Sequence, residues 1–536
     1  MKPFDINGAF LPSIPGGGDK LRHVAVRSAG VTVLSGGFTV AIQMLATVVL
    51  ARLLTPRDFG LVAMATTFSL LFVNFGLNGI TEAVIQQERI DRTLASNLFW
   101  INLGIGLLLT LCFAAAASLI ARFYEEPLVA PIVIGISATI AFTSTSVLHL
   151  ALLKRAMLFT AVAKNDMVAK GISVAVSIVL GWMGWGYWAL VVGACILPLS
   201  TAVGAWILCR WLPGRPRYSS ETGSMVLFAL HTYGRFSLNY VTRNTDNLLV
   251  GWRFGPQSLG MYKKAYDLFA LASSQIATST TVVAVAALSR VREDRDLYCR
   301  YLVGALTVMA FLGMGISGVL TLTGRDVIRL ILGPKWAPAG YLFTFFGPGI
   351  GAQFLYCTQG WIHLSIGRAD RWFRWSILEL FVTYLLFFLG LHWGVQGIAV
   401  AWGLSFWILT VPALSYAGKP IGLRVPPMLA AIWRFIVASL LAGLISAFIA
   451  TKLGVMAVAS SAFGATLRIA LLSLFFVGLY LLAIISLGGY STLRNMSKLL
   501  REMLTKVKVE QIGVISTEGG GLVTDIPQFH VHSDAE

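Results

Sequence analysis

The chain has 536 residues, of which 57% are hydrophobic and only 12% charged, with a mean hydropathy of +0.77 and a formal net charge of +17. A soluble globular protein carries about 25% charged residues, so this composition excludes that class. Apolar runs of about 20 residues, long enough to cross ~30 Å of hydrocarbon, recur along most of the chain. They are continuous rather than short and alternating, which excludes a transmembrane β-barrel. The composition therefore predicts an all-α polytopic membrane protein.

The N-terminal segment 1–27 contains Gly and Pro and lacks the apolar core of a cleavable signal peptide. It is therefore expected to be a tail that precedes an uncleaved first membrane helix. Beyond it, apolar runs between polar breaks predict about fourteen helices, with ends defined to within several residues. Their expected spans are 28–51, 59–80, 94–120, 128–151, 162–184, 187–209, 225–250, 265–289, 301–323, 341–362, 375–391, 396–417, 431–451 and 463–488.

The positive charges are distributed unevenly over the connections between these helices. Most of the 41 lysines and arginines fall on one side of the membrane when the N-terminus is placed in the cytoplasm. This pattern follows the positive-inside rule, so both termini, including the tail 489–536, are expected to be cytoplasmic. Topology and anionic membrane lipids account for the excess positive charge. Nucleic acid is therefore not an expected partner.

An internal repeat links the two halves of the chain. The segments "LARLLTPRDFGLV" (50–62) and "VGWRFGPQSLGMY" (250–262) align so that Pro56 matches Pro256 and Gly60 matches Gly260. Each segment joins the first two helices of a six-helix set, and an even number of helices preserves orientation. We therefore expect two parallel six-helix lobes, 28–210 and 225–417, around a central cavity. Two extra C-terminal helices, 431–488, lie outside the repeat.

The first helix of the second lobe carries an unusual polar stripe. At 100° per residue, its polar positions fall within an arc of roughly 120°. A charge near a helix centre costs at least ~2.5 kcal/mol, so such residues usually face a protein interior or an aqueous cavity. Arg235 falls about 15 Å from the cytoplasmic end, near the midplane. The stripe consists of His231, Arg235, Asn239, Thr242, Arg243 and Asp246.

Several of these charges also have a purely structural interpretation. Arg243 and Asp246 are spaced i,i+3 and can neutralise each other near the outer interface, and Asp166 and Lys170 form a similar i,i+4 pair. The adjacent Glu125 and Glu126 are expected in a solvated loop, because neighbouring residues cannot face one substrate as glycosidase carboxylates do.

Motifs typical of an enzyme or a pump are missing from the sequence. It contains no Walker loop, HExxH or CxxC, and the loops expected outside the membrane are too short for a conventional catalytic domain. We therefore expect a transporter without a catalytic residue, a cofactor or a metal site.

The combined motifs resemble the Wzx-type polysaccharide flippases, the polysaccharide transporter (PST) group of the MOP superfamily. The resemblance rests on "LARLLTPRDFGLVAMA", "FGLNGITEAVIQQE", "GWGYWALVVG", "NTDNLLVGWRFGPQSLGMYKKAYDL" and "LILGPKWAPAGYLF", which occur in order between about residues 25 and 415. It implies transfer of undecaprenyl-diphosphate-linked oligosaccharide units across a bacterial inner membrane by alternating access, for exopolysaccharide or lipopolysaccharide biosynthesis. It also implies coupling to an ion gradient, H⁺ or Na⁺.

This resemblance gives the polar residues expected roles in binding the substrate. Arg235 and Arg243 are candidates to hold the diphosphate, since arginine recognises phosphate groups well. His231 and Asn239 are candidates to contact sugar hydroxyls. Asp246 is expected to orient Arg243 or to sense the coupling ion. Arg52, at the outer end of the first helix, is either part of the cavity rim or an interfacial anchor.

Other functions remain open at this point. One is a small-molecule (drug) exporter of the same fold, although a cationic stripe disfavours cationic drugs. Another is a membrane glycosyltransferase or polymerase, which needs larger outer loops than this chain has. A third is a scaffold of the polysaccharide polymerisation machinery, with 431–488 and the tail as docking surface. Polysaccharide polymerase and chain-length or export proteins are candidate partners, besides the lipid-linked oligosaccharide and membrane lipids.

Overall fold

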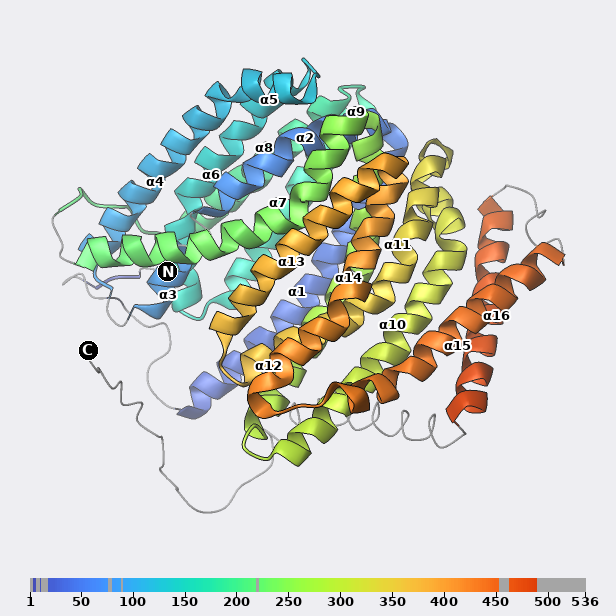
Figure 1. Cartoon of the computed structure of the whole chain (residues 1–536). Coiled ribbons are helices and arrows are strands. Elements are labelled where there is room, and N and C mark those ends of the chain that lie inside the picture. Colours follow the sequence, from blue (N-terminus) through green and yellow to red (C-terminus); the bar gives the residue numbers. More distant parts are fainter. Residues whose placement is uncertain are drawn as a thin grey trace.

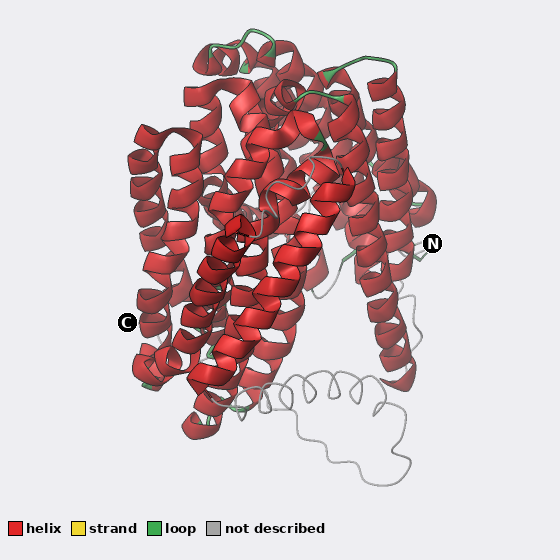
Figure 2. Ribbon diagram, turned by 90° about the vertical axis from the view of Figure 1, so that its right-hand side faces the viewer, coloured by secondary structure: helices red, strands yellow, loops and turns green. Residues whose placement is uncertain are grey.

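A computed structural model of the chain describes residues 3–5, 10, 18–75, 80–87, 90–217, 221–452 and 462–488. This part of the chain is almost entirely helical, with a single isolated β-bridge between Phe4 and Phe10 (Figures 1 and 2). The predicted all-α class is confirmed. The expected C-terminal tail, 489–536, lies outside the described residues.

The first lobe contains helices α1 to α8, which lie mostly on the left of Figure 1. The predicted helix 94–120 is divided at Ala116 into two helices, α4 and α5. The bounds are α1 (Gly18–Leu53), α2 (Pro56–Phe75), α3 (Thr81–Gln86), α4 (Arg92–Ala115), α5 (Ala117–Tyr124), α6 (Val129–Arg155), α7 (Phe159–Trp182) and α8 (Tyr187–Cys209).

The second lobe and the two extra helices follow in the same order as predicted. The predicted helix 341–362 is divided at Cys357. The bounds are α9 (Glu221–Arg290), α10 (Arg295–Leu332), η2 (Pro334–Trp336), α11 (Ala337–Tyr356), α12 (Thr358–Ser365), α13 (Ala369–Gly390), η3 (Leu391–Trp393), α14 (Gly394–Gly418), η4 (Lys419–Ile421), α15 (Val425–Lys452) and α16 (Ala462–Gly488).

Helix α9 contains two of the predicted helices in one continuous run. Gly255, at φ 77° and ψ 179°, breaks the helical geometry, and Pro256 follows it directly. A positive φ is strained for any residue with a side chain, and proline cannot donate to the preceding turn. These two residues therefore bend the chain where the sequence predicts the connection between helices, and the second helix begins at the proline.

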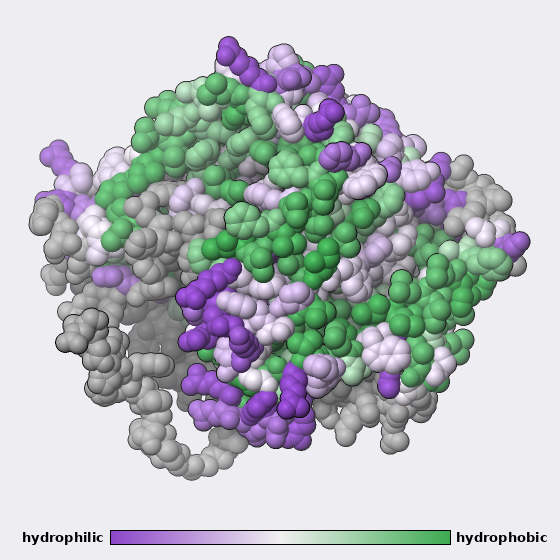
Figure 3. Space-filling view, viewed as in Figure 1, coloured by the Kyte–Doolittle hydropathy of each residue, from purple (hydrophilic) through white to green (hydrophobic). Residues whose placement is uncertain are grey.

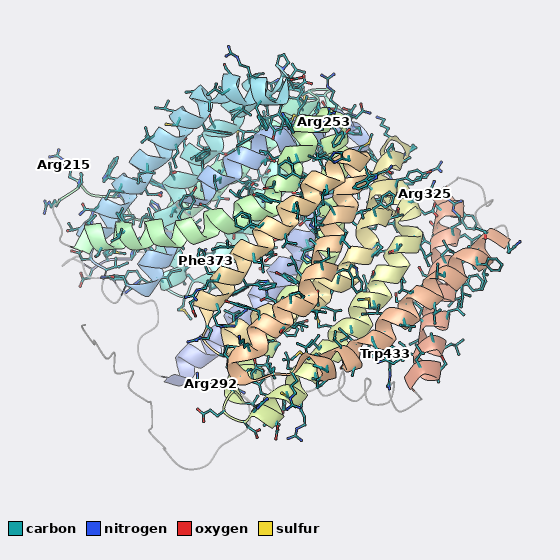
Figure 4. All side chains as sticks on the ribbon, viewed as in Figure 1. Arg215, Arg253, Arg292, Arg325, Phe373 and Trp433 are labelled. Carbon is teal, nitrogen blue, oxygen red and sulfur yellow. The ribbon has the colours of Figure 1, made fainter. Side chains whose placement is uncertain are left out.

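The surface is that of a multi-pass membrane protein. By length and composition, eight helical segments of the described residues are apolar enough to cross a membrane. Large apolar side chains such as Leu111 and Leu474 are 68% and 71% exposed, an arrangement that a lipid environment accommodates. Figure 3 shows hydrophobic side chains over most of this face, with hydrophilic ones gathered near its upper and lower parts. In Figure 4, Arg253 and Arg325 lie near the upper end and Arg292 near the lower end.

The two lobes bury a histidine at equivalent places. The segments "HLALLKR" (149–155) and "HLSIGRA" (363–369) align, and both His149 and His363 are fully buried. The ring of His149 stacks on Trp206 of α8 at 4.4 Å between centroids, and the ring of His363 lies 6.0 Å from that of Tyr416 of α14. Each histidine thus packs against the last helix of its own lobe. The exact limits of the lobes, 28–210 and 225–417, stay a prediction.

One charge arrangement differs from expectation. Among the described residues, Asp166 and Lys170 do not form the predicted ion pair; Asp166 is exposed, and an exposed pair gains little from a fixed contact. Glu125 and Glu126 lie in the loop between α5 and α6 as expected, where Glu125 is exposed and Glu126 pairs with Arg57 at 3.1 Å.

The extra helices α15 and α16 are anchored to α10 of the second lobe. Arg468 of α16 donates from Nε to Asp326 Oδ2 at 3.0 Å and from Nη2 to Asp326 Oδ1, and the two side chains are 7% and 15% exposed. The Tyr480 hydroxyl donates to the Phe311 carbonyl, and Ser439 Oγ donates to the Met314 carbonyl. The charge at position 468, which falls inside a predicted membrane span, therefore has an oppositely charged partner that is mostly shielded from the surroundings.

We expect Arg468→Ala to lower the free energy of unfolding by about 3 kcal/mol, because a buried Asp326 carboxylate loses its partner. The matched control is Arg368→Ala, since Arg368 and Asp370 form an ion pair of 3.9 Å with both side chains more than half exposed. That change is expected to cost about 1 kcal/mol or less. Denaturant unfolding in detergent measures both, and equal losses would contradict the anchoring role.

Candidate functional site: a bent polar helix between the lobes

The N-terminal arm of α9, residues 221–254, packs along α2 of the first lobe. The hydroxyl of Tyr233 donates to the Leu71 carbonyl at 2.8 Å, and that of Tyr240 donates to the Thr67 carbonyl at 3.0 Å. On the other side, Thr245 Oγ1 donates to the hydroxyl of Tyr384 in α13 of the same lobe at 2.6 Å. This arm, which begins the second lobe, therefore lies at the interface between the two lobes.

The predicted polar stripe lies on this arm. At 100° per residue, the centre of the stripe is roughly 130° around the helix from Tyr233 and Tyr240, which contact α2. The stripe positions thus lie away from α2. The backbone of His231, Arg235, Asn239 and Arg243 is helical, and the side chains of these four residues lie outside the described part of the chain. Their substrate contacts stay predictions.

Asp246 is the member of the stripe whose side chain is described. It is 2% exposed, and its Oδ2 accepts a hydrogen bond of 2.8 Å from the Tyr262 hydroxyl, while its Oδ1 accepts one of 2.8 Å from the Asn247 amide. Tyr262 lies beyond the break at Gly255, in the second arm of α9. Because a buried carboxylate needs hydrogen-bond partners, this bond ties the two arms together. The sequence predicted Arg243 as the partner and did not identify Tyr262.

Arg52 lies at the end of α1 and connects the lobes from the surface. Its exposed guanidinium donates from Nη2 to the Leu330 carbonyl of α10 at 3.1 Å. Both predicted roles, a cavity rim and an interfacial anchor, place the residue at this end of the molecule. The contact adds that Arg52 reaches across to the second lobe.

Lys264 is a cation that the sequence reasoning did not select. Its Nζ lies 4.3 Å from the ring centroid of Phe59 in α2, a cation–π contact between the lobes. The neighbouring Lys263 pairs instead with Asp267 at 3.3 Å. The signal in the sequence was a lysine pair just after the Gly-Pro break, and nothing in the local pattern indicated a distant aromatic partner.

The ranges that the structure describes contain no group of three or more His, Cys, Asp or Glu side chains placed to hold a metal ion.

Comparison with known proteins finds similar sequences and similar folds. The chain is 22% identical over 313 residues to the succinoglycan biosynthesis transport protein ExoT of Rhizobium meliloti, a match that covers 58% of this chain and 63% of that protein. The chain thus spans less than two thirds of the length of this relative.

Two solved structures share the fold. The lipid II flippase MurJ in an inward closed conformation superposes with a TM-score of 0.66 at 14% identity, covering 84% of this chain and 97% of that one. A multidrug resistance MATE family transporter of the MOP superfamily, in an inward-facing conformation, gives 0.51 at 14% identity over 73% of this chain and 94% of that one.

A family model described as "polysaccharide biosynthesis protein" matches residues 49–340, more than half of the chain. This range includes both copies of the repeat and the whole of α9. The chain belongs to this family of polysaccharide biosynthesis proteins.

Proposed function

We propose that this protein is a flippase that moves undecaprenyl-diphosphate-linked oligosaccharide units across the bacterial inner (cytoplasmic) membrane by alternating access. The observation that carries the proposal is the bent helix α9, which lies at the interface between two lobes of a MurJ-like fold and bears the polar stripe. A diphosphate joined to a glycan cannot cross hydrocarbon unaided, and cationic groups in a lipid-shielded path lower that barrier.

The proposed topology places both termini in the cytoplasm and the end with Pro56 and Pro256 outside. In this orientation the substrate enters between the lobes at the end that carries Arg292 and leaves at the end that carries Arg253 (Figure 4). Arg235 and Arg243 hold the diphosphate, and His231 and Asn239 contact the glycan. Arg52 lines the exit. The proposed energy source is an H⁺ or Na⁺ gradient, and the protein acts without catalysis.

Asp246 acts through the shape of α9 in this proposal. Its bond to Tyr262 holds the two arms of the helix at a fixed angle while one state of the transporter is populated. A change in the carboxylate, by ion binding or by a new bond to Arg243, frees the arms to move. Hydrogen bonds to a charged group contribute about 1.5–3 kcal/mol, enough to bias two states of similar energy.

A drug exporter of the same fold is the second candidate, favoured by the superposition on the MATE transporter. Drug cations require a net acidic path, whereas the stripe of α9 contains two arginines and one aspartate. A scaffold role in the polymerisation machinery, with polymerase and chain-length or export proteins as partners, is compatible with flipping rather than an alternative to it.

Deletion of the gene in its host is expected to make complete lipid-linked repeat units accumulate in the inner leaflet. Extraction of the lipid-linked oligosaccharides, followed by a leaflet-specific accessibility assay, measures this. Truncated glycans, or complete units in the outer leaflet, would instead indicate synthesis or polymerisation.

Arg235→Ala is expected to reduce polymer export at least roughly tenfold at unchanged protein abundance, because one charge-assisted contact to phosphate is worth about 1.5–3 kcal/mol. Arg215→Ala, at an exposed position before α9, is the matched control and should export normally. Normal export by the Arg235 variant would remove that residue from the substrate path.

Tyr262→Phe is expected to destabilise the protein by about 1–3 kcal/mol, because Asp246 keeps its buried charge and loses a donor. Adding Asp246→Asn should recover part of that loss, since the buried group is then neutral. Thermal unfolding in lipid nanodiscs measures both. Additive losses in the double variant would show that the two side chains do not act together.

A further inference from the structure

The two copies of the repeat touch each other directly. A Cβ atom added at Gly60 would lie 1.6 Å from the Pro256 carbonyl oxygen, and one added at Gly260 would lie 1.9 Å from the Pro56 carbonyl oxygen. Each glycine thus packs against the backbone of the proline in the other copy. Such reciprocal contacts arise when two equivalent segments meet across a two-fold axis. An approximate two-fold axis therefore passes between Gly60 and Gly260.

A second pair of segments follows the same symmetry. "RFYEEPLVAP" (122–131) aligns with "RLILGPKWAP" (329–338), so that Phe123 corresponds to Leu330. Arg52 of the first lobe contacts Leu330 of the second. In the other direction, Trp252, the counterpart of Arg52 in the repeat, stacks on Phe123 with the ring centroids 6.3 Å apart. The lobes thus exchange equivalent contacts on both sides of the axis.

One position in this arrangement breaks the symmetry. Trp336 aligns with Val129, and both side chains are fully buried. The indole Nε1 of Trp336 donates to the Ala51 carbonyl at 2.8 Å, and its ring lies 5.4 Å from that of Phe59. Val129 has no group able to donate such a bond. A single large side chain of the second lobe is therefore fixed against the end of α1 and the start of α2.

These contacts gather at one end of the molecule, near the upper edge of Figure 1, where α2 begins and α9 bends. We call them the junction, defined by Ala51, Gly60, Pro256, Gly260 and Trp336. We propose that the junction is the gate that closes this end of the transporter, held shut by the packing of Gly60 and Gly260 and by the buried Trp336. The proposal rests on the flippase function above, because it assigns the residues that alternate between closed and open.

Both sets of contacts hold the two lobes together at this end of the molecule. The glycines bring the two backbones into direct contact, and Trp336 of the second lobe is fixed against α1 and α2 of the first. Opening therefore breaks the bond to Ala51 and withdraws a buried indole from Phe59, and both terms favour the closed state.

The test measures the separation of the lobes without any substrate. Spin labels are placed at Arg122→Cys on α5 and Tyr341→Cys on α11, two exposed positions in opposite lobes near the junction. The five native cysteines are replaced by serine or alanine, and the full chain is studied in lipid nanodiscs by pulsed electron paramagnetic resonance. The doubly labelled protein without further substitution, called the parent, is expected to give a single population of short distances between the two labels.

Trp336→Val, which installs the residue of the equivalent position, is expected to raise a longer population at least several-fold. Trp336→Phe keeps an aromatic ring against Phe59 but loses the N–H group that donates to Ala51, so the label distances should shift less. This variant also tests the proposal if the valine variant does not fold. Trp433→Val removes an exposed tryptophan of α15 far from the junction and should change nothing (Figure 4). If both Trp336 variants give the same distribution of label distances as the parent, Trp336 does not hold the gate closed.

Gly60→Ala tests the glycine contact, because its methyl group forces the two backbones apart. Gly104→Ala is the matched control, since a Cβ there meets nothing within 4 Å. A longer population in the first variant and none in the second supports the role of the glycine contact in closing the gate, and identical distributions contradict it. If the label distances shift as expected but the parent moves no oligosaccharide, the gate is supported and the proposed function is wrong. If the parent moves oligosaccharide but the distances do not shift, the function is supported and the gate is wrong.

Discussion

The close approach of two backbones is the constraint on which the rest of this structure depends. Gly60 against Pro256 and Gly260 against Pro56 leave no room for a side chain, so both copies of the repeat must carry glycine there. This contact fixes how the lobes meet at one end. The bend of α9 lies in the same segment, because Gly255 directly precedes Pro256. The contact between the lobes and the bend of α9 thus lie next to each other in the chain.

The bend determines the environment of the polar residues of α9. It brings Tyr262 back onto Asp246, so the carboxylate is buried with a donor that lies in the other arm of the helix. The N-terminal arm lies between α2 of the first lobe and α13 of the second. A charge near a helix centre costs at least ~2.5 kcal/mol in hydrocarbon, so the proposed flippase requires the stripe to face the path between the lobes.

Much of the fold could be predicted from the sequence, because hydropathy over about 20 residues reports directly on membrane helices. The repeat also predicted which segments are equivalent, although it gave no sign that the two copies touch. The contacts of the site were harder to predict. The partner of Asp246 depends on the bend at Gly255, Lys264 meets an aromatic ring of the other lobe, and Trp336 binds a carbonyl of α1. These contacts are set by tertiary packing, which local spacing does not encode.

The most direct test of the central claim is a flipping assay with purified protein in liposomes. A fluorescent undecaprenyl-diphosphate oligosaccharide is placed in the inner leaflet, an ion gradient is applied, and a membrane-impermeant glycosidase reports the arrival of the glycan outside. The account predicts protein-dependent exposure that is faster than in empty liposomes and slower when Ala51→Cys and Trp336→Cys are joined by a disulfide. Exposure at the rate of empty liposomes, under both H⁺ and Na⁺ gradients, would contradict it.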